Sequence, residues 1–323
     1  MLSIKQVITK LVWQLPPSIR DNLRNIYRGS IFRKKHPENH FFIQVIDGST
    51  FHGGLTDRLK GIISSYLYCK IKNITFKINH ISPFNLSSFL IPNSYNWTLP
   101  SKDVLSENIF ESKLLYLIGD PSIHRLISLK TKKQIHCFSN RDIINELNIH
   151  YGTTYTWGSL FKELFKPSEY LQKELSKYKK IAGENYYSAI FRFQNLLGDF
   201  IEYDDVKELD EINKSLLINK CKQSIIELKN KLGNTRILIT SDSKLFLNEI
   251  SSIEELITFP EDNVHMDNTS GQSLKIYQKS FIDFILISES LGVYSIGTPI
   301  MYKTEFPLYA AKINNIPFER VEI

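Results

Sequence analysis

Short, strongly apolar runs alternate with amphipathic runs at helical spacing along most of this chain. A short apolar run bounded by polar residues predicts a buried strand, and apolar positions that recur every three or four residues predict a helix. In the first half we expect strands over 41–46, 74–78, 114–118 and 134–138, with helices over 56–71 and 141–147. In the second half we expect strands over 186–193, 236–240, 256–259 and 293–296, with helices over 211–232 and 306–314. Residues 281–290 fit either a helix or an apolar strand.

Strands that alternate with helices indicate an α/β fold with mostly parallel sheets. At 323 residues the chain is long enough for two domains of ordinary size. We expect a basic helical arm over 1–36, a Rossmann-like domain over 37–150, a helical linker over 151–183 and a second Rossmann-like domain over 184–323. In the linker, Ser168 is the predicted N-cap of a lysine-rich helix that packs one face and leaves the other in solvent.

The N-terminal arm has a net charge of +7, whereas the whole chain has +6. Residues 2–15 and 18–27 both show amphipathic helical spacing, and Pro16 and Pro17 separate them. Up to residue 36 a single acid, Asp21, stands against eight basic residues: Lys5, Lys10, Arg20, Arg24, Arg28, Arg33, Lys34 and Lys35. Residues 1–35 therefore fit a peripheral contact with an anionic membrane, or else a helical arm that packs on the body or on a second copy.

Composition excludes several classes of protein. Beyond the arm the chain is nearly neutral, which argues against a nucleic-acid-binding body. No apolar run reaches the length of a membrane span, and the N-terminus has no signal-peptide pattern. The three cysteines, Cys69, Cys137 and Cys221, are far apart in apolar contexts and form no C-x-x-C pair, so we expect small core residues of a reduced, cytoplasmic protein.

A glycine turn between a strand and a helix is the first candidate site. Gly53 and Gly54 follow the apolar run 41–46, and the helical pattern that begins at Thr56 carries Arg58 in its first turn. Adjacent glycines permit close backbone approach, and a helix N-terminus with an arginine suits an anion. The alternative is an ordinary tight turn with a solvated arginine. The stretch matches neither the dinucleotide G-x-G-x-x-G nor the P-loop pattern.

A second candidate is Arg192, which lies in the apolar run 186–193. A buried arginine needs a partner. It is either a structural partner of a carboxylate such as Asp199 or Asp242, or a clamp for a phosphate or a departing anion. We expect no metal site, because neither H-E-x-x-H nor H-x-x-E-H occurs in the sequence, and no Asp-x-Asp occurs.

Four stretches together resemble the fucosyltransferase-like superfamily of glycosyltransferases. The glycine turn at 53–59 resembles its N-terminal Gly-rich loop, and 190–193 resembles its His-x-Arg-Arg strand. Residues 239–243 and the pair of stretches 281–288 and 299–311 resemble its later motifs. The resemblance implies a GT-B fold with two Rossmann-like domains, a GDP-sugar donor, inversion at the sugar and no metal cofactor. The resemblance covers about residues 40–323. Within the superfamily, the chain is similar to bacterial polysaccharide-cluster members.

The resemblance also implies roles for single residues. Arg192 contacts the donor diphosphate, Asp283 reads the guanine edge, and Tyr302 with Thr304 belongs to the phosphate-binding turn. Ile190 and Phe193 depart from the motif, where many members have His and a second Arg; Gln194 or His265 supplies the missing hydrogen bond. The other implied residues are Gly53, Gly54, Arg58 and Ser288, on the donor or acceptor side. For the general base the sequence itself offers Asp57, which lies beside the glycine turn, and Asp199, Glu202 or Asp242, with Asp242 somewhat better suited to a structural role.

The sequence thus predicts a glycosyltransferase of bacterial capsule or O-antigen synthesis. It would transfer a sugar, with fucose the leading choice, from a GDP-sugar to a saccharide or lipid-linked saccharide, at the inner face of the plasma membrane. Two alternatives stay open: a UDP-sugar or other nucleotide-sugar enzyme, and a non-catalytic sugar-binding scaffold. An NAD-dependent enzyme is disfavoured because G-x-G-x-x-G is absent.

Overall fold

The computed structural model describes residues 15–28, 40–101, 104–106, 108–119, 123–200, 207–233, 235–261, 266 and 273–323. The chain divides into two compact units. The first comprises the residues up to 52 with 57–81 and 94–156, and the second comprises 53–56, 82–93 and 157–323. The helix predicted over 2–15 lies outside the described residues except for its last position.

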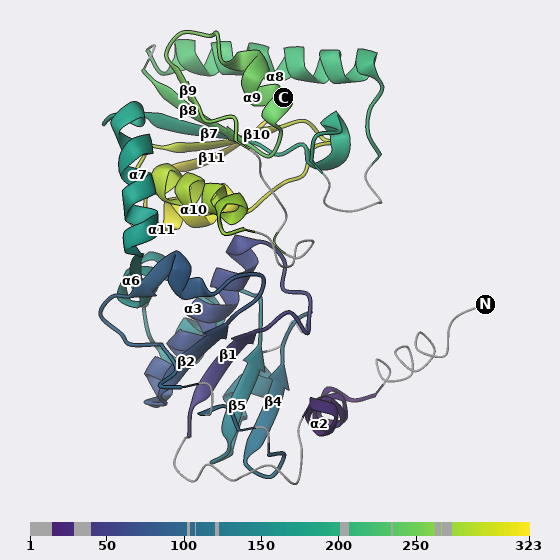
Figure 1. Cartoon of the computed structure of the whole chain (residues 1–323), viewed down its shortest axis with the longest axis vertical. Coiled ribbons are helices and arrows are strands. Elements are labelled where there is room, and N and C mark those ends of the chain that lie inside the picture. Colours follow the sequence, from purple (N-terminus) through teal and green to yellow (C-terminus); the bar gives the residue numbers. More distant parts are fainter. Residues whose placement is uncertain are drawn as a thin grey trace, which may run out of the picture. The chain divides into compact units, whose positions relative to one another are not determined.

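The first unit contains a parallel sheet in the order β2-β1-β5-β4 (Figure 1). Gly61 in α3 lies so close to the end of β5 that an added Cβ would be 1.9 Å from the carbonyl oxygen of Ser139. Only glycine fits there. The strands are β1 (Phe42–Ile46), β2 (Phe76–His80), β4 (Ser112–Tyr116) and β5 (Gln134–Phe138), and the helices are α2 (Pro17–Arg28), α3 (Leu55–Lys72), α4 (His124–Ile127) and α5 (Ile144–Tyr151).

The second unit contains a parallel sheet in the order β11-β10-β7-β8-β9. Its strands are β7 (Tyr187–Phe191), β8 (Ile237–Ser241), β9 (Leu256–Thr258), β10 (Val293–Gly297) and β11 (Phe318–Glu322). Its helices are α6 (Trp157–Leu164), α7 (Glu169–Ala182), α8 (Glu211–Lys231), α9 (Lys244–Ile250), α10 (Lys275–Ser288) and α11 (Phe306–Asn314), with 3₁₀ turns η1 (Leu86–Ser88) and η3 (Gln194–Leu197). A small antiparallel pair joins β3 (Leu90–Pro92) to β6 (Phe165–Pro167).

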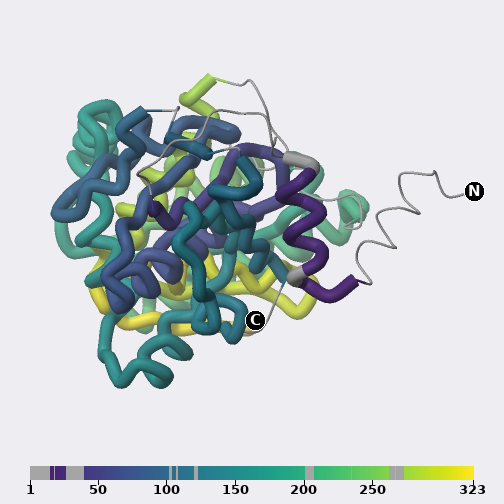
Figure 2. The backbone as a smooth tube through the Cα atoms, turned by 90° about the horizontal axis from the view of Figure 1, so that it is seen from below, coloured from purple at the N-terminus to yellow at the C-terminus, as the bar shows by residue number. Residues whose placement is uncertain are grey.

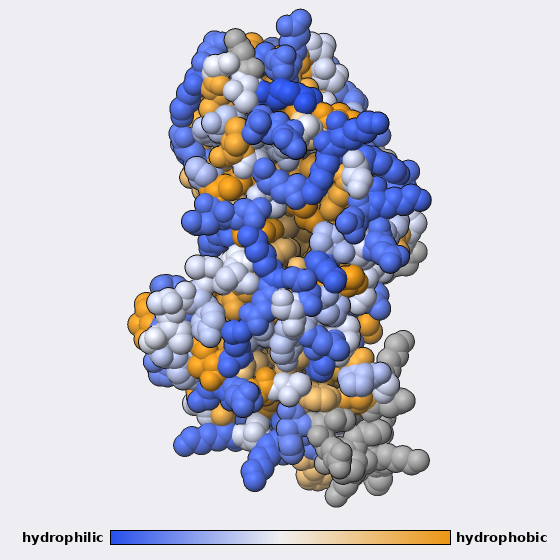
Figure 3. Space-filling model, turned by 90° about the vertical axis from the view of Figure 1, so that its left-hand side faces the viewer, coloured by the Kyte–Doolittle hydropathy of each residue, from blue (hydrophilic) through white to orange (hydrophobic). Residues whose placement is uncertain are grey.

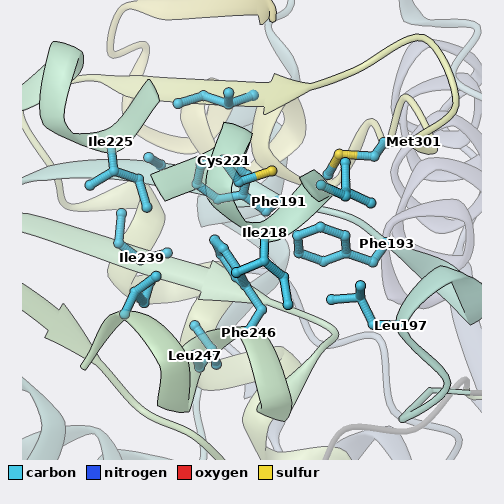
Figure 4. Close-up of a cluster of buried hydrophobic side chains, with 14 of the residues drawn as sticks. Phe191, Phe193, Leu197, Ile218, Cys221, Ile225, Ile239, Phe246, Leu247 and Met301 are labelled. Atoms are coloured by element: carbon cyan, nitrogen blue, oxygen red, sulfur yellow. The ribbon is translucent and has the colours of Figure 1, made fainter. Parts of the chain in front are cut away.

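Helices cover both faces of the second sheet, with α8 and α9 on one side and α10 and α11 on the other (Figure 1). Figure 4 shows the core on the α8 side, where Phe191 and Phe193 meet Ile218 of α8 and Phe246 of α9. Burial of such side chains is the main stabilising term of a fold of this kind. On the face drawn in Figure 3, hydrophilic residues cover most of the surface and hydrophobic residues form small separate groups.

Most of the predicted elements are present. The strand over 134–138 and the helix over 306–314 have the predicted bounds, and Ser168 caps α7 by accepting a hydrogen bond from the Leu171 N–H. The ambiguous segment is the helix α10, whose residues from Tyr277 to Ser288 are all buried except Ser280, which is partly exposed. Because a helix buried all round has no polar face, its sequence carries no clear period.

Three features differ from the prediction. The expected linker is not a separate segment, because α6 and α7 belong to the second unit. The strand expected over 186–193 ends at Phe191, so Arg192 lies just beyond it. The edge strand β11 was not predicted, since most of its residues are exposed and it lacks an apolar run.

All three cysteines are buried and unpaired, as predicted for core residues. Burial raises the pKa of the Cys137 and Cys221 thiols to about 12. Their thiols therefore stay protonated at neutral pH and are poor nucleophiles.

Gly158 provides a test of the packing of α6 on α11. A Cβ at this position would be 2.2 Å from the carbonyl oxygen of Lys312 and 2.6 Å from that of Ile313. These are backbone atoms, so the helices must move apart. We expect Gly158→Ala to lower the free energy of unfolding by about 1–3 kcal/mol, measured by urea unfolding. Lys162→Ala, on the exposed side of the same helix, is the control and should change the free energy of unfolding by about 0.5 kcal/mol or less. An equal loss in both variants would contradict the packing argument.

Candidate functional site

The strand order of the second sheet reverses between β7 and β10. From β7 the chain proceeds outward through β8 to β9, then returns to place β10 on the other side of β7. In open parallel sheets a ligand binds beyond the carboxyl ends of the strands at such a switch point. The residues that follow β7 and β10 are therefore the first to consider.

Arg192 is the first residue after β7. Its Nη1 lies 3.2 Å from Oδ2 of Asp242, and its guanidinium carbon lies 4.6 Å from the centre of the Phe200 ring. The side chain is 18% exposed. The carboxylate and the ring thus hold a fixed cation at the carboxyl edge of the sheet, with part of it open to a ligand.

Asp242 follows β8 and binds the backbone directly after Arg192. Its side chain is almost fully buried and accepts hydrogen bonds from the N–H of Phe193 at 2.9 Å and of Gln194 at 2.6 Å. These bonds explain why β7 ends at Phe191, because the next two N–H groups after Arg192 donate to the carboxylate and not to a neighbouring strand. Burial raises the pKa of Asp242, and Arg192 with the two N–H groups opposes that rise. Both oxygens are thus engaged, which favours the structural alternative over a general base.

Thr298 is a candidate that the sequence argument missed. It follows Gly297, the last residue of β10. In the parallel pairing of β10 with β7, Ser295 is opposite Ile190, so the end of β10 lies beside Arg192. The Tyr302 N–H also donates to the carbonyl of Arg192 at 3.3 Å, so the two loops meet. The Thr298 hydroxyl is buried and has no hydrogen-bond partner among the described residues. A Gly-Thr-Pro sequence directly after a predicted strand was the available signal.

The predicted phosphate turn, at Tyr302 and Thr304, has other contacts. The Thr304 hydroxyl accepts a hydrogen bond from the N–H of Phe306 at the start of α11. Ser288 is at the opposite edge of the sheet, because α10 runs antiparallel to the strands and ends before β10 begins. Its buried hydroxyl donates to the carbonyl of Ile285. The structure therefore brings Arg192, Gln194, Thr298 and Tyr302 together, and not Ser288.

Asp283 lies in the middle of α10 and is buried. Its Oδ2 accepts a hydrogen bond from Nζ of Lys279, one turn earlier, at 2.7 Å. Its Oδ1 is buried with no hydrogen-bond partner among the described residues. Burial raises the pKa of this carboxyl and Lys279 opposes the rise. An unpaired acceptor of this kind can receive an N–H from a ligand.

The glycine turn precedes α3. Gly53 has a φ of +85°, which glycine adopts at no cost, and Gly54 leads directly into the helix at Leu55. Asp57 is 41% exposed and pairs with Lys60 at 3.0 Å, while Arg58 is buried and held by contacts of its own. Arg58 is therefore not the solvated arginine of an ordinary turn.

Three predicted candidates remain: Asp199, Glu202 and His265. Asp199 accepts hydrogen bonds from the Ser243 hydroxyl and the Leu245 N–H at the start of α9. His265 and Glu202 lie outside the described residues. Within the described ranges, no group of three or more His, Cys, Asp or Glu side chains is placed to hold a metal ion.

Comparison with solved structures shows which fold this is. The Arabidopsis thaliana fucosyltransferase FUT1 in complex with GDP matches 94% of this chain and 74% of its own, with a TM-score of 0.58 and 13% identity. The Bradyrhizobium α-1,6-fucosyltransferase NodZ, co-crystallised with GDP, matches 85% and 92%, with a TM-score of 0.52 and 11% identity. POFUT1 in complex with GDP, for which no organism is printed, matches 88% and 99%, with a TM-score of 0.51 and 9% identity.

No protein-family model and no curated protein sequence matches the chain. The structural matches nevertheless extend over most of the chain and over most of each matched protein. This agrees with the resemblance found in the four sequence stretches. The chain has the GT-B fold of the fucosyltransferases.

Proposed function

We propose that this protein is a glycosyltransferase that uses a GDP-sugar, with fucose as the leading sugar. The observation that carries the proposal is that Arg192 and the Thr298 hydroxyl, which bonds to no described residue, both follow strand ends at the switch point of the second sheet. A fixed guanidinium and a hydroxyl donor are the groups that bind a diphosphate. The three matched fucosyltransferase structures contain GDP, and a further NodZ crystal was soaked with GDP-fucose.

In the proposed reaction an acceptor hydroxyl attacks the anomeric carbon of the sugar as the bond to the diphosphate breaks. Negative charge grows on the leaving diphosphate, and Arg192 and the Thr298 hydroxyl stabilise it. A carboxylate removes the acceptor proton. Asp57 stays our candidate base, because it is partly exposed while the oxygens of Asp242 and Asp199 hold backbone N–H groups.

The unpaired oxygen of Asp283 suits guanine, whose N1–H and amino group both donate hydrogen bonds. Uracil offers a single N–H beside two acceptor oxygens. We therefore propose GDP rather than UDP as the nucleotide. From the sequence resemblance we further propose a metal-independent, inverting reaction on a saccharide or lipid-linked saccharide, in the synthesis of a bacterial capsule or O-antigen in the cytoplasm.

Thr298→Val is expected to weaken GDP binding about tenfold or more while leaving the stability of the free protein unchanged. GDP binding weakens because the lost hydroxyl would donate to a charged phosphate. Stability is unchanged because the hydroxyl bonds to no described residue in the free protein. A thermal-shift titration with GDP, UDP, CDP and NAD measures both quantities, since a ligand that binds the native state raises the melting temperature. Thr258→Val, at the end of the distant edge strand β9, is the matched control.

The possible outcomes separate the hypotheses. A shift with GDP alone, reduced in Thr298→Val and retained in Thr258→Val, supports the donor site. A shift with UDP alone replaces the nucleotide but keeps the enzyme class. No shift with any nucleotide favours the sugar-binding scaffold over an enzyme.

A further inference from the structure

Helix α2 packs against β4, the strand at one edge of the first sheet (Figure 1). The contacts of this helix with the sheet are polar. The Asn25 side chain donates to the carbonyl of Ser112, Asp21 accepts from the N–H of Tyr116, and the Arg24 guanidinium lies 3.8 Å from the centre of the Tyr116 ring. The face that an amphipathic helix usually turns to solvent is thus turned to the protein.

The apolar residues of α2 point the other way. At 3.6 residues per turn, Ile19, Leu23 and Ile26 fall within a sector of about 60°, opposite Asp21. They are 45%, 43% and 59% exposed. In Figure 2 this helix is the purple segment. The outward face of α2 is therefore an apolar stripe.

The segment of sequence that contains the stripe carries charge of mainly one sign. Up to residue 36 the sequence has eight basic residues and a single acid, Asp21. That acid is buried and paired with Arg125 of α4. No carboxylate of this segment is therefore left to face outward, and the segment as a whole is strongly cationic.

We propose that the stripe Ile19, Leu23 and Ile26 docks on an anionic lipid bilayer. Apolar burial at the level of the headgroups and attraction between basic residues and anionic lipid together bind helices of this kind. Because the polar face of α2 is already bonded to β4, the helix needs no rearrangement to present its apolar face. Among the helices of the described residues, none combines the length and hydrophobicity that a bilayer span requires.

A second protein copy is the principal rival occupant. Two copies of a strongly cationic segment repel one another across a symmetric interface, whereas phosphatidylglycerol attracts such a segment. The charge therefore favours the bilayer. Helix α8 offers a control for the stripe, because its Ile212 and Leu216 are also apolar and exposed, at 75% and 61%.

The test is sedimentation of the full chain with vesicles of phosphatidylcholine, with and without about 30% phosphatidylglycerol. We expect binding to the anionic vesicles only, weakened when NaCl rises from about 0.1 to 0.5 M. Leu23→Asn/Ile26→Asn should lower the partition coefficient about tenfold or more. Ile212→Asn/Leu216→Asn, with equal hydrophobic loss on α8, should leave it unchanged.

A gain-of-binding variant guards against misfolding as an explanation. Asn22 is exposed beside the stripe, so Asn22→Leu widens it and should raise the partition coefficient severalfold. Equal binding to neutral vesicles, or full binding by Leu23→Asn/Ile26→Asn, overturns the proposal. So does a wild-type dimer that becomes a monomer in that variant, because a second copy then covers the stripe. GDP-induced thermal shifts should be the same in all these variants, which keeps this test separate from the proposed enzymatic function.

Discussion

Arg192→Lys is expected to lower the rate of donor cleavage about 10²–10³-fold with the fold intact. Lysine keeps a positive charge beside Asp242, so the buried carboxylate is not left alone. It loses the planar fork that can hold Asp242 and a phosphate at once, and it stacks less well on Phe200. GDP release from GDP-fucose without an acceptor is the assay, because departure of the diphosphate is the step that Arg192 would stabilise.

Arg236→Lys is the matched control for this variant. Arg236 precedes β8 at the opposite edge of the same sheet, where its guanidinium donates to the carbonyls of Ile181 and Ala182. Its replacement should leave the rate unchanged. A rate for Arg192→Lys within twofold of the wild type would remove Arg192 from the chemistry.

Asp283→Leu is expected to lower the free energy of unfolding by about 3–5 kcal/mol. The substitution leaves the ammonium of Lys279 buried without its only described carboxylate contact, at 2.7 Å in the wild type. Replacing both partners, as Lys279→Met/Asp283→Leu, removes both charges and should restore stability to within about 1–2 kcal/mol of the wild type. Urea unfolding followed by tryptophan fluorescence, to which the buried Trp157 of the second unit contributes, measures each variant.

The folded double variant also tests the role proposed for Asp283. If its carboxylate reads guanine, GDP should no longer raise the melting temperature of Lys279→Met/Asp283→Leu, although the protein is stable. A normal GDP-induced rise in the melting temperature would mean that Lys279 and Asp283 form a purely structural pair. A single variant as stable as the double variant would mean that Lys279 finds another partner or water.

The sequence predicted the parallel α/β organisation because buried strands and their turns have local signals. Arg192 and Asp242 were found for the same reason, since each interrupts or follows an apolar run. Thr298 was not found, because its importance depends on β10 lying beside β7 rather than beside β9. Strand order is set by long-range packing, which no local pattern reports. Asp283 was found only through the resemblance, and its partner Lys279 was not recognised.

The polar contacts between α2 and β4 also bear on how this protein should be handled. Outward-pointing backbone groups of β4 are bonded to side chains, the Ser112 carbonyl to Asn25 and the Tyr116 N–H to Asp21. An edge strand without such cover is a template on which another chain can add a strand. Shortening the chain past α2 would uncover this edge, and the truncated protein is expected to aggregate through β4 during expression.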